Sequence, residues 1–208
     1  MMWLTDIIVF PDYKFTTKDG IIALGGDLSE ERLIYAYKNG IFPWFSEGDP
    51  IVWYCPHERM VLFPNEIKVS KSMQKIIHKN KFVITENKAF KEVIYNCKNI
   101  DRGDGFGTWI TDDMEQAYIN LYERGLAKSI EIWLNNELVG GLYGVEAHNI
   151  FCGESMFSKV SNASKLAFIH LVKSNNYELI DCQVYNAHLA SLGAREIDRK
   201  TFLSILKS

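Results

Sequence analysis

Apolar and polar positions follow two successive styles along the chain, and the second style predicts a mixed domain of helices and strands. From residue 63 onward, stretches whose apolar residues recur at helical spacing alternate with stretches of strand character. Two helices are expected behind caps at Asn87 and Thr111, the second of them ending at Gly125. A three-stranded antiparallel meander should follow, and then a helix, a strand and two short helices. The meander is expected over residues 129–134, 137–146 and 150–157, the next helix over 162–174 and the next strand over 177–184.

Residues 1–62 read differently, because turn formers and aromatic residues interrupt any regular spacing, and four of the five prolines lie there. One helix is clear: Ser29 can cap it, two acids follow in its first turn, and Gly40 ends it. We therefore expect a small irregular N-terminal domain over residues 1–62 and a larger domain over residues 63–208. The larger domain should be a mixed sheet flanked by helices, of the α/β (α+β) class that acyltransferases often use.

Composition narrows the class of protein. The chain has 208 residues, of which 47% are hydrophobic and 24% charged, and its formal net charge is -3. These values are typical of a globular protein, and no apolar run is long enough to span a bilayer. The first residues carry no export signal, so we expect a cytoplasmic protein without a membrane partner. The four cysteines lack the spacing of a zinc site, so we expect neither a disulfide nor a structural metal.

Three polar side chains interrupt otherwise apolar strands. Glu154 lies within FCGESMFSK, and Asp181 and Gln183 lie two positions apart in YELIDCQV. An acid in an apolar strand is costly unless it is paired, hydrogen-bonded or facing a wet cleft. Two residues with this spacing project from the same face of a strand, so the three could form one polar island if their strands are neighbours. The alternative is that each is a structural residue that ties a strand end to a helix.

Aromatic and basic residues supply two further candidates. Trp44 and Trp109 each sit where a turn meets regular structure, at positions that often build the rim of a pocket, although most aromatic residues are simply core. The stretch 66–82 is basic, and Lys71, Lys75 and Lys79 repeat every four residues along one helical face. Such a face could follow nucleic-acid phosphates, although charge runs are more commonly solvated helix surfaces.

Several familiar motifs are missing. Glycines 103, 105 and 107 occur in the wrong order for a dinucleotide-binding loop, so the segment is expected to be a plain loop. The acyl-CoA pyrophosphate loop of acetyltransferases, a histidine metal site and a nucleophilic serine elbow are also not found.

The motifs taken in order are more specific than any one alone. GESMFS followed by NASK and then IDCQ, together with ALGGDLS, AYKNGIFPWF, FGTWI, LVGGLYGV and HLASLGAREI, resembles the bacterial leucyl/phenylalanyl-tRNA–protein transferase family. The resemblance runs from about residue 20 to the end of the chain.

What the resemblance implies is an aminoacyltransferase. It would move Leu or Phe from aminoacyl-tRNA to the N-terminal Arg or Lys of an acceptor protein, marking that protein for N-end-rule degradation. It also implies a small N-terminal domain followed by an acetyltransferase-like domain. The substrate-binding residues that match the family are Tyr37, Trp44, Trp109, Tyr118, Leu142, Phe151, Met156 and Phe168. The catalytic residues that match are Glu154, Asp181 and Gln183, and the tRNA-binding helix matches the segment with Lys71, Lys75 and Lys79. The RGDGFG insert before Thr108 is longer than the family pattern.

The reaction itself sets modest demands. An amine attacks an activated ester, so no cofactor or metal is required, and the enzyme mainly has to select and orient a neutral amine. Gln183 can accept a hydrogen bond from the attacking amine while Asp181 polarises and aligns it. The final proton acceptor is open among the tRNA ribose hydroxyl, water and Glu154, and the alternative role of Glu154 is to attract a cationic acceptor. An apolar pocket of this kind should reward Leu, Phe and, by the same argument, Met.

Two alternatives stay open at this point. One is a related transferase whose acceptor begins with Asp or Glu. The other is a non-catalytic RNA-binding module that uses only the lysine helix. The transferase is expected to act as a monomer.

Overall fold

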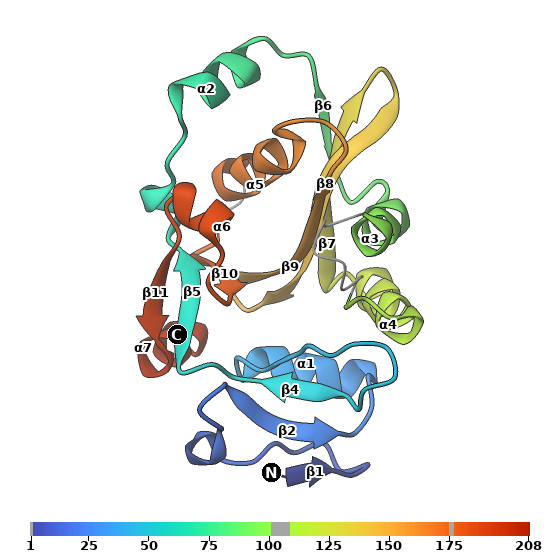
Figure 1. Ribbon diagram of the computed structural model, residues 1–208, viewed down its shortest axis with the longest axis vertical. Coiled ribbons are helices and arrows are strands. Elements are labelled where there is room, and N and C mark those ends of the chain that lie inside the picture. Colours follow the sequence, from blue (N-terminus) through green and yellow to red (C-terminus); the bar gives the residue numbers. More distant parts are fainter. Residues whose placement is uncertain (1, 101–108, 175–176) are drawn as a thin grey trace.

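The computed structural model describes residues 2–100, 109–174 and 177–208, and these residues form two sheets (Figure 1). The smaller sheet has the strand order β1–β2–β4–β3, and the larger one has the order β11–β5–β10–β9–β8–β7–β6. The strands of the smaller sheet are β1 (Met2–Leu4), β2 (Ile21–Gly25), β3 (Phe42–Pro43) and β4 (Val52–Tyr54). Those of the larger sheet are β5 (Glu58–Leu62), β6 (Val83–Glu86), β7 (Ala127–Leu134), β8 (Glu137–Ala147), β9 (Ile150–Ser158), β10 (Leu179–Gln183) and β11 (Arg195–Asp198).

Helices cover both faces of the larger sheet (Figure 1). Two clusters of buried apolar side chains lie on opposite faces, one under α3 and α4 and the other under α5. The helix α1 lies between the two sheets (Figure 1), and its buried residues join the first cluster. The helices are α1 (Glu30–Lys38), α2 (Lys71–His78), α3 (Phe90–Asn99), α4 (Asp112–Glu123), α5 (Ala163–Ser174), α6 (Ala187–Ser191) and α7 (Arg199–Leu206). None of these helices in the described part of the chain combines the length and apolar character of a membrane span.

The expected meander is confirmed as β7–β8–β9. Asn135 and Asn136 form its first turn with φ values of 51° and 64°, and His148 in the second turn has φ of 54°. Asparagine tolerates this left-handed backbone better than most residues, which explains why such short polar turns can join long apolar strands. The expected α/β class, with a mixed sheet flanked by helices, is therefore confirmed.

A parallel crossover brings the polar residues of the sequence together. β9 is followed by α5, which crosses one face of the sheet, and then by β10, which pairs parallel to β9 with Asp181 opposite Cys152. Because β9 and β10 are direct neighbours, Gln183 at the C-terminal end of β10 can meet Glu154 in the middle of β9.

The N-terminal part is more regular than its sequence indicates, since it contains a four-stranded sheet and α1. The larger sheet takes β5 as well, so the two sheets divide the chain between β4 and β5, a few residues before the boundary expected after residue 62. The strand β11 lies between the two short C-terminal helices, where no strand was expected.

Helix caps agree with expectation in part. Thr111 caps α4 by accepting a hydrogen bond from the Met114 N–H at 3.2 Å. Asn87, by contrast, does not cap α3, which begins after Ala89; the Asn87 side chain accepts a hydrogen bond from the Ser129 N–H of β7 instead. Ser29 stands at the N-cap position of α1 but makes no side-chain capping bond.

The ladder between β8 and β9 generates a stability prediction. Gly144 and Gly153 face each other across it, but a Cβ at Gly144 would lie 2.3 Å from the Cys152 carbonyl oxygen, whereas one at Gly153 would meet nothing closer than 3.5 Å. Gly144→Ala should therefore lower the free energy of unfolding by about 1–3 kcal/mol, measured by urea denaturation. Gly153→Ala is the matched control, and an equal loss in both variants would show that the close approach at Gly144 is not the cause.

Candidate active site

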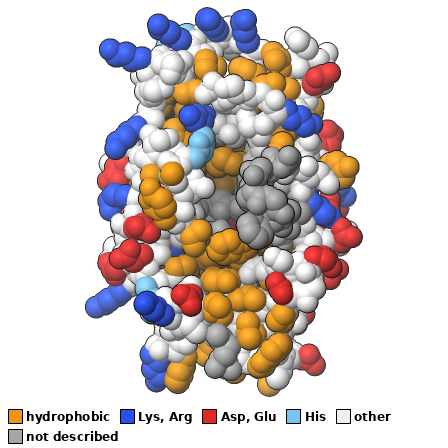
Figure 2. Space-filling view, in the orientation of Figure 1, with side chains coloured by type: hydrophobic (Ala, Val, Ile, Leu, Met, Phe, Trp, Pro, Cys, Tyr) orange, Lys and Arg blue, Asp and Glu red, His pale blue; other side chains and the backbone are white. Residues whose placement is uncertain are grey.

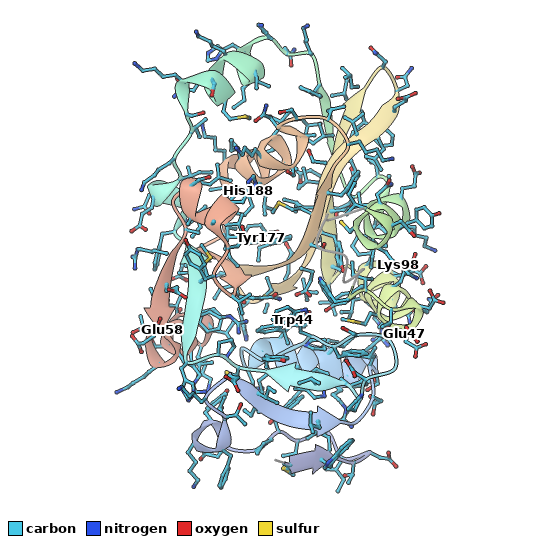
Figure 3. The ribbon with its side chains drawn as sticks, in the orientation of Figure 1. Trp44, Glu47, Glu58, Lys98, Tyr177 and His188 are labelled. Atoms are coloured by element: carbon cyan, nitrogen blue, oxygen red, sulfur yellow. The ribbon has the colours of Figure 1, made fainter. Side chains whose placement is uncertain are left out.

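A cavity of about 470 Å³ opens beside β9 and β10, within the size range of small-molecule sites. Figure 2 shows a hollow at the centre of this face, lined largely by hydrophobic side chains. In Figure 3, Trp44 lies at its lower margin near the smaller sheet and His188 at its upper margin on α6. The expected site residues that line the cavity are Trp44, Trp109, Leu142, Phe151, Glu154, Met156, Phe168, Asp181 and Gln183.

One part of the cavity is apolar and has an aromatic rim. Leu142 and Phe151 come from neighbouring strands, and Phe168 projects from α5, so three elements of the larger sheet and its covering helix build the wall. Trp44 is 39% exposed, and its ring centroid lies 5.5 Å from that of Tyr54. An exposed indole at the mouth of an apolar cavity is typical of a surface on which a planar or apolar ligand group rests.

Glu154 enters the cavity through a β-bulge. In the ladder with β8, Gly153 pairs with Gly144 and Ser155 pairs with Tyr143, so Glu154 is the extra residue and has no partner across the ladder. A bulge of this kind re-aims a side chain that simple alternation would point elsewhere. The position of Glu154 is therefore set by backbone geometry as well as by its hydrogen bonds.

The Glu154 carboxylate is buried yet hydrogen-bonded on both oxygens. The Tyr118 hydroxyl donates to Oε2 at 2.9 Å, and the Gln183 amide Nε2 donates to Oε1 at 2.8 Å. Burial raises the pKa of Glu154 to about 7, although hydrogen bonds from tyrosine hydroxyls act in the opposite direction. A carboxyl group that titrates near neutral pH can both take up and release a proton at physiological pH.

Tyr37 and Tyr118 lie behind the Glu154 carboxylate, outside the lining of the cavity. Both are almost fully buried, neither lines the cavity, and their hydroxyl oxygens are 2.6 Å apart. Since Tyr118 donates to Glu154, the pair forms a hydrogen-bonded support behind the carboxylate. Their substrate-binding role, expected from the resemblance, stays a prediction.

Asp181 forms an ion pair with Arg59, a residue that the sequence did not indicate as part of the site. Arg59 on β5 donates from Nε to Oδ1 at 2.7 Å and from Nη2 to Oδ2 at 2.6 Å, and both side chains are buried. The guanidinium lies between the rings of Phe42 and Phe202, 4.6 and 4.7 Å from their centroids. The one available signal was an arginine directly before the apolar run Met60–Leu62.

The Asp181 carboxylate holds the backbone of Gln183 in place. The Asp181 Oδ1 accepts a hydrogen bond from the Gln183 N–H at 2.9 Å, rather than contacting the side-chain amide. A second bulge, at Cys182, separates the two residues, and Gln183 has φ of +63°, so simple alternation along β10 is interrupted there. Asp181 thus holds the strained backbone from which the Gln183 amide reaches Glu154.

The basic helix lies apart from the cavity. α2 carries Lys71 and Lys75, Lys79 follows at its C-terminal end, and all three side chains are exposed. Figure 2 shows lysine and arginine side chains gathered at the top of the molecule, where Figure 1 places α2. The RGDGFG segment, including glycines 103, 105 and 107, lies outside the described residues.

The fold and the cavity together indicate an enzyme of the α/β class that holds an apolar group beside a buried carboxylate. The profile of the leucyl/phenylalanyl-tRNA protein transferase family matches residues 61–207, and that of its N-terminal domain matches residues 26–57. The chain belongs to the leucyl/phenylalanyl-tRNA protein transferase family, and this confirms the family and the aminoacyltransferase class expected from its motifs.

Individual relatives agree with the family profiles. The leucyl/phenylalanyl-tRNA–protein transferase of Flavobacterium psychrophilum is 57% identical over 210 residues that cover all of both chains. That of Nitrosospira multiformis is 52% identical and covers 99% of this chain and 90% of its own. Among solved structures, a GCN5-related N-acetyltransferase from Kribbella flavida covers 77% of this chain and 58% of its own at 7% identity, but its TM-score of 0.40 is too low to support an inference.

The buried Arg59–Asp181 pair should dominate local stability. Arg59→Met leaves an uncompensated buried carboxylate, so the free energy of unfolding should fall by about 3–5 kcal/mol. The exposed pair of Arg195 with Glu66 has the same paired-oxygen geometry, and Glu66→Gln should cost only a small fraction of that loss because solvent screens the pair. Chemical denaturation of both variants checks the difference, and similar small losses would contradict a structural role for Arg59.

Glu154 should make stability depend on pH. Its pKa is about 7 when folded against an ordinary value of 4.5, so between these values the folded state keeps a proton that the unfolded state has released. The free energy of unfolding contributed by this group therefore falls as pH rises through that interval and is constant above it. Glu154→Gln should abolish this component when stability is compared at about pH 5 and about pH 8. Glu137→Gln, at an exposed acid on β8, should leave it unchanged.

Proposed function

We propose that this chain transfers Leu or Phe from aminoacyl-tRNA to the N-terminal Arg or Lys of acceptor proteins and so marks them for N-end-rule degradation in the cytoplasm. The observation that carries the proposal is the direct hydrogen bond between Glu154 and Gln183 at the border of an apolar cavity. Family membership supplies the class of reaction, and this border supplies a place where an apolar aminoacyl group and an attacking amine can meet.

The donor side chain would occupy the apolar part of the cavity. Leu142, Phe151, Met156 and Phe168 surround it, and burial of a Leu, Phe or Met side chain there is worth roughly 1.5–3 kcal/mol. A pocket of this kind separates apolar side chains of similar volume poorly, so donor use should overlap among the three. Trp44 and Trp109 at the rim are suited to stack on the terminal adenosine.

The acceptor amine would be oriented by Gln183. Because the Gln183 amide nitrogen donates to Glu154, its carbonyl oxygen is left to accept a hydrogen bond from the attacking amine. The amine nitrogen then attacks the ester carbonyl carbon, the peptide bond forms and the bond to the ribose oxygen breaks. Glu154 takes the proton that the amine loses, and the departing ribose oxygen is protonated in turn.

Charge in the cavity favours a cationic acceptor. Asp181 is neutralised by Arg59, whereas Glu154 is hydrogen-bonded only to uncharged groups. No lysine or arginine stands among the described residues that line the cavity. An acceptor that begins with Arg or Lys would therefore find a carboxylate and no repelling cation, which argues against one that begins with Asp or Glu.

The exposed lysines of α2 would contact the tRNA away from the reacting ends. Lys71, Lys75 and Lys79 can reach phosphates, but a surface that only binds RNA has no use for the Glu154–Gln183 pair or for an apolar cavity beside it. These features favour the transferase over the RNA-binding alternative.

A transfer assay across acceptor termini tests the proposal. Purified protein with leucyl-tRNA should add Leu to peptides that begin with Arg or Lys, and not to matched peptides that begin with Asp or Ala, with product followed by mass spectrometry. Transfer to the Asp peptide alone would identify the other acceptor class, and binding of tRNA without any product would support the RNA-binding module.

Gln183→Ala separates chemistry from binding. The variant loses the amide but keeps the backbone N–H that Asp181 holds. The kcat for transfer should fall by about 10²-fold or more, while the Kd for tRNA stays within about twofold. Lys75→Gln is the complementary control, since it should weaken tRNA binding without lowering kcat. Equal losses of kcat and tRNA affinity in Gln183→Ala would remove Gln183 from the reaction centre.

A further inference from the structure

A second cavity lies between α2, α5 and α6. Its wall includes two lysines, Lys68 before α2 and Lys165 on α5, and two serines, Ser70 and Ser191. Ammonium groups beside a depression are donors that proteins use for phosphate oxygens. The two serines shape the wall instead, because the Ser191 hydroxyl donates to the His188 carbonyl at 2.6 Å and Ser70 Oγ accepts the Met73 N–H at 3.2 Å. The three lysines assigned above to tRNA binding are not part of this wall.

The second cavity adjoins the first through nearby residues of the same helices. On α5, Ser164 lines the first cavity and Lys165 the second; on α6, His188 lines the first and Ser191 the second. The Lys68 N–H donates to the Leu192 carbonyl at 2.8 Å, which fixes the segment before α2 against the end of α6. A ligand that extends from the first cavity between these helices would enter the second.

Lys165 is placed where an anion would relieve an unfavourable arrangement. It lies in the first turn of α5, half-buried, at the end where the helix dipole disfavours a cation. Among the residues that the structure describes, neither Lys165 nor Lys68 forms an ion pair, and the nearby Glu66 is engaged by Arg195. The positive charge of Lys165 is therefore not paired with a described carboxylate, whereas Lys68 interacts at longer range with Glu66.

His188 lines the first cavity from α6, the helix whose Ser191 lines the second. Its Nε2 atom is buried and has no hydrogen-bond partner among the described residues, and Figure 3 shows the side chain at the upper margin of the first cavity. Figure 2 shows a histidine and a basic side chain together at this rim. A buried ring nitrogen without a partner costs free energy unless a ligand supplies one.

We propose that Lys68 and Lys165 form a subsite for the phosphodiesters of the single-stranded 3′ end of the donor RNA, directly beyond the cavity that receives its aminoacyl group. This rests on the proposed function, because an aminoacyl group in the first cavity is covalently followed by a charged strand of this kind. Passing from the first cavity to α2, the strand would meet His188, then the two lysines, and then the lysine face of α2.

Donors of increasing length test the subsite. Leucyl-adenosine has no phosphate, a leucyl trinucleotide ending in CCA has the nearest phosphodiesters, and leucyl-tRNA adds the duplex. For Lys165→Gln and Lys68→Gln, the KM of the trinucleotide should rise by about tenfold each, as expected for one charge-assisted contact. The KM and kcat for leucyl-adenosine should not change. Lys173→Gln, which removes the same charge from the exposed far end of α5, is the matched control.

Variants of the α2 lysines should show the opposite dependence on donor length. Lys79→Gln should weaken use of leucyl-tRNA but not of the trinucleotide, since Lys79 lies at the C-terminal end of α2, away from the residues of α2 that line the second cavity. In Lys165→Gln and Lys68→Gln, the salt dependence of trinucleotide binding should also become shallower. The slope of log K against log salt should change by about 0.7 for each phosphate that the variant no longer neutralises.

Three outcomes would overturn the subsite. An unchanged trinucleotide KM in both variants, an equal loss with phosphate-free leucyl-adenosine, or an equal effect of Lys173→Gln would each do so while wild-type transfer remains intact. If the wild-type protein transfers Leu from none of the three donors, the proposed function is overturned instead. The two failures are therefore distinguishable.

Discussion

The ion pair of Arg59 with Asp181 is the contact on which the arrangement of the cavity depends. It spans β5 and β10, and the same guanidinium donates to the Gly40 carbonyl after α1, so one side chain links the N-terminal helix to these two neighbouring strands of the larger sheet. Burying two charges is costly, and that cost is offset here by a paired-oxygen geometry and by two aromatic rings that enclose the guanidinium. A hydrophobic pair could fill this space with less desolvation. It could not supply Asp181 Oδ1, however, which accepts the N–H of Gln183 and holds the left-handed backbone there.

Two β-bulges bring the side chains of Glu154 and Gln183 together. Glu154 is the extra residue of β9 and Cys182 that of β10, in strands that pair in parallel. Each bulge releases one residue from strict alternation, and the freed side chains of Glu154 and Gln183 meet between the two strands. The tyrosine pair behind Glu154 holds the carboxylate through the Tyr118 hydroxyl. Burial raises the pKa of Glu154 and the tyrosine hydrogen bonds act in the opposite direction, so the pKa is about 7.

The helices and strands of the larger domain were more predictable from the sequence than the side-chain contacts within the site. Period and turn residues located β7, β8, β9, α5 and β10, because long apolar runs and Asn turns express local preferences that tertiary structure did not override. The polar island of Glu154, Asp181 and Gln183 was also foreseeable, since uncompensated polar residues in strands are conspicuous. Arg59 was not, because nothing in its own strand distinguishes a buried partner from a surface arginine. The bulges were equally hidden: a one-residue shift of register leaves no mark on composition. The short strands β1–β4 were masked by prolines and aromatic residues that resemble loops.

The apolar wall of the cavity and its polar border are built from different parts of the fold. Under the proposed function, binding of the donor side chain and attack by the amine would therefore depend on separate residues. The apolar wall is built from sheet residues that also belong to the core, so its volume is fixed by packing and can distinguish donors only by size. The polar border is built from bulged backbone and a few hydrogen bonds, so its charge can distinguish acceptors without altering that volume. Cations lie beyond the upper rim, on α2 and α5, so the proposed RNA strand would be held without a positive charge beside the proposed acceptor amine. Keeping these surfaces apart leaves no lysine or arginine among the described residues that line the cavity beside Glu154, and burial is then the largest cause of its raised pKa of about 7.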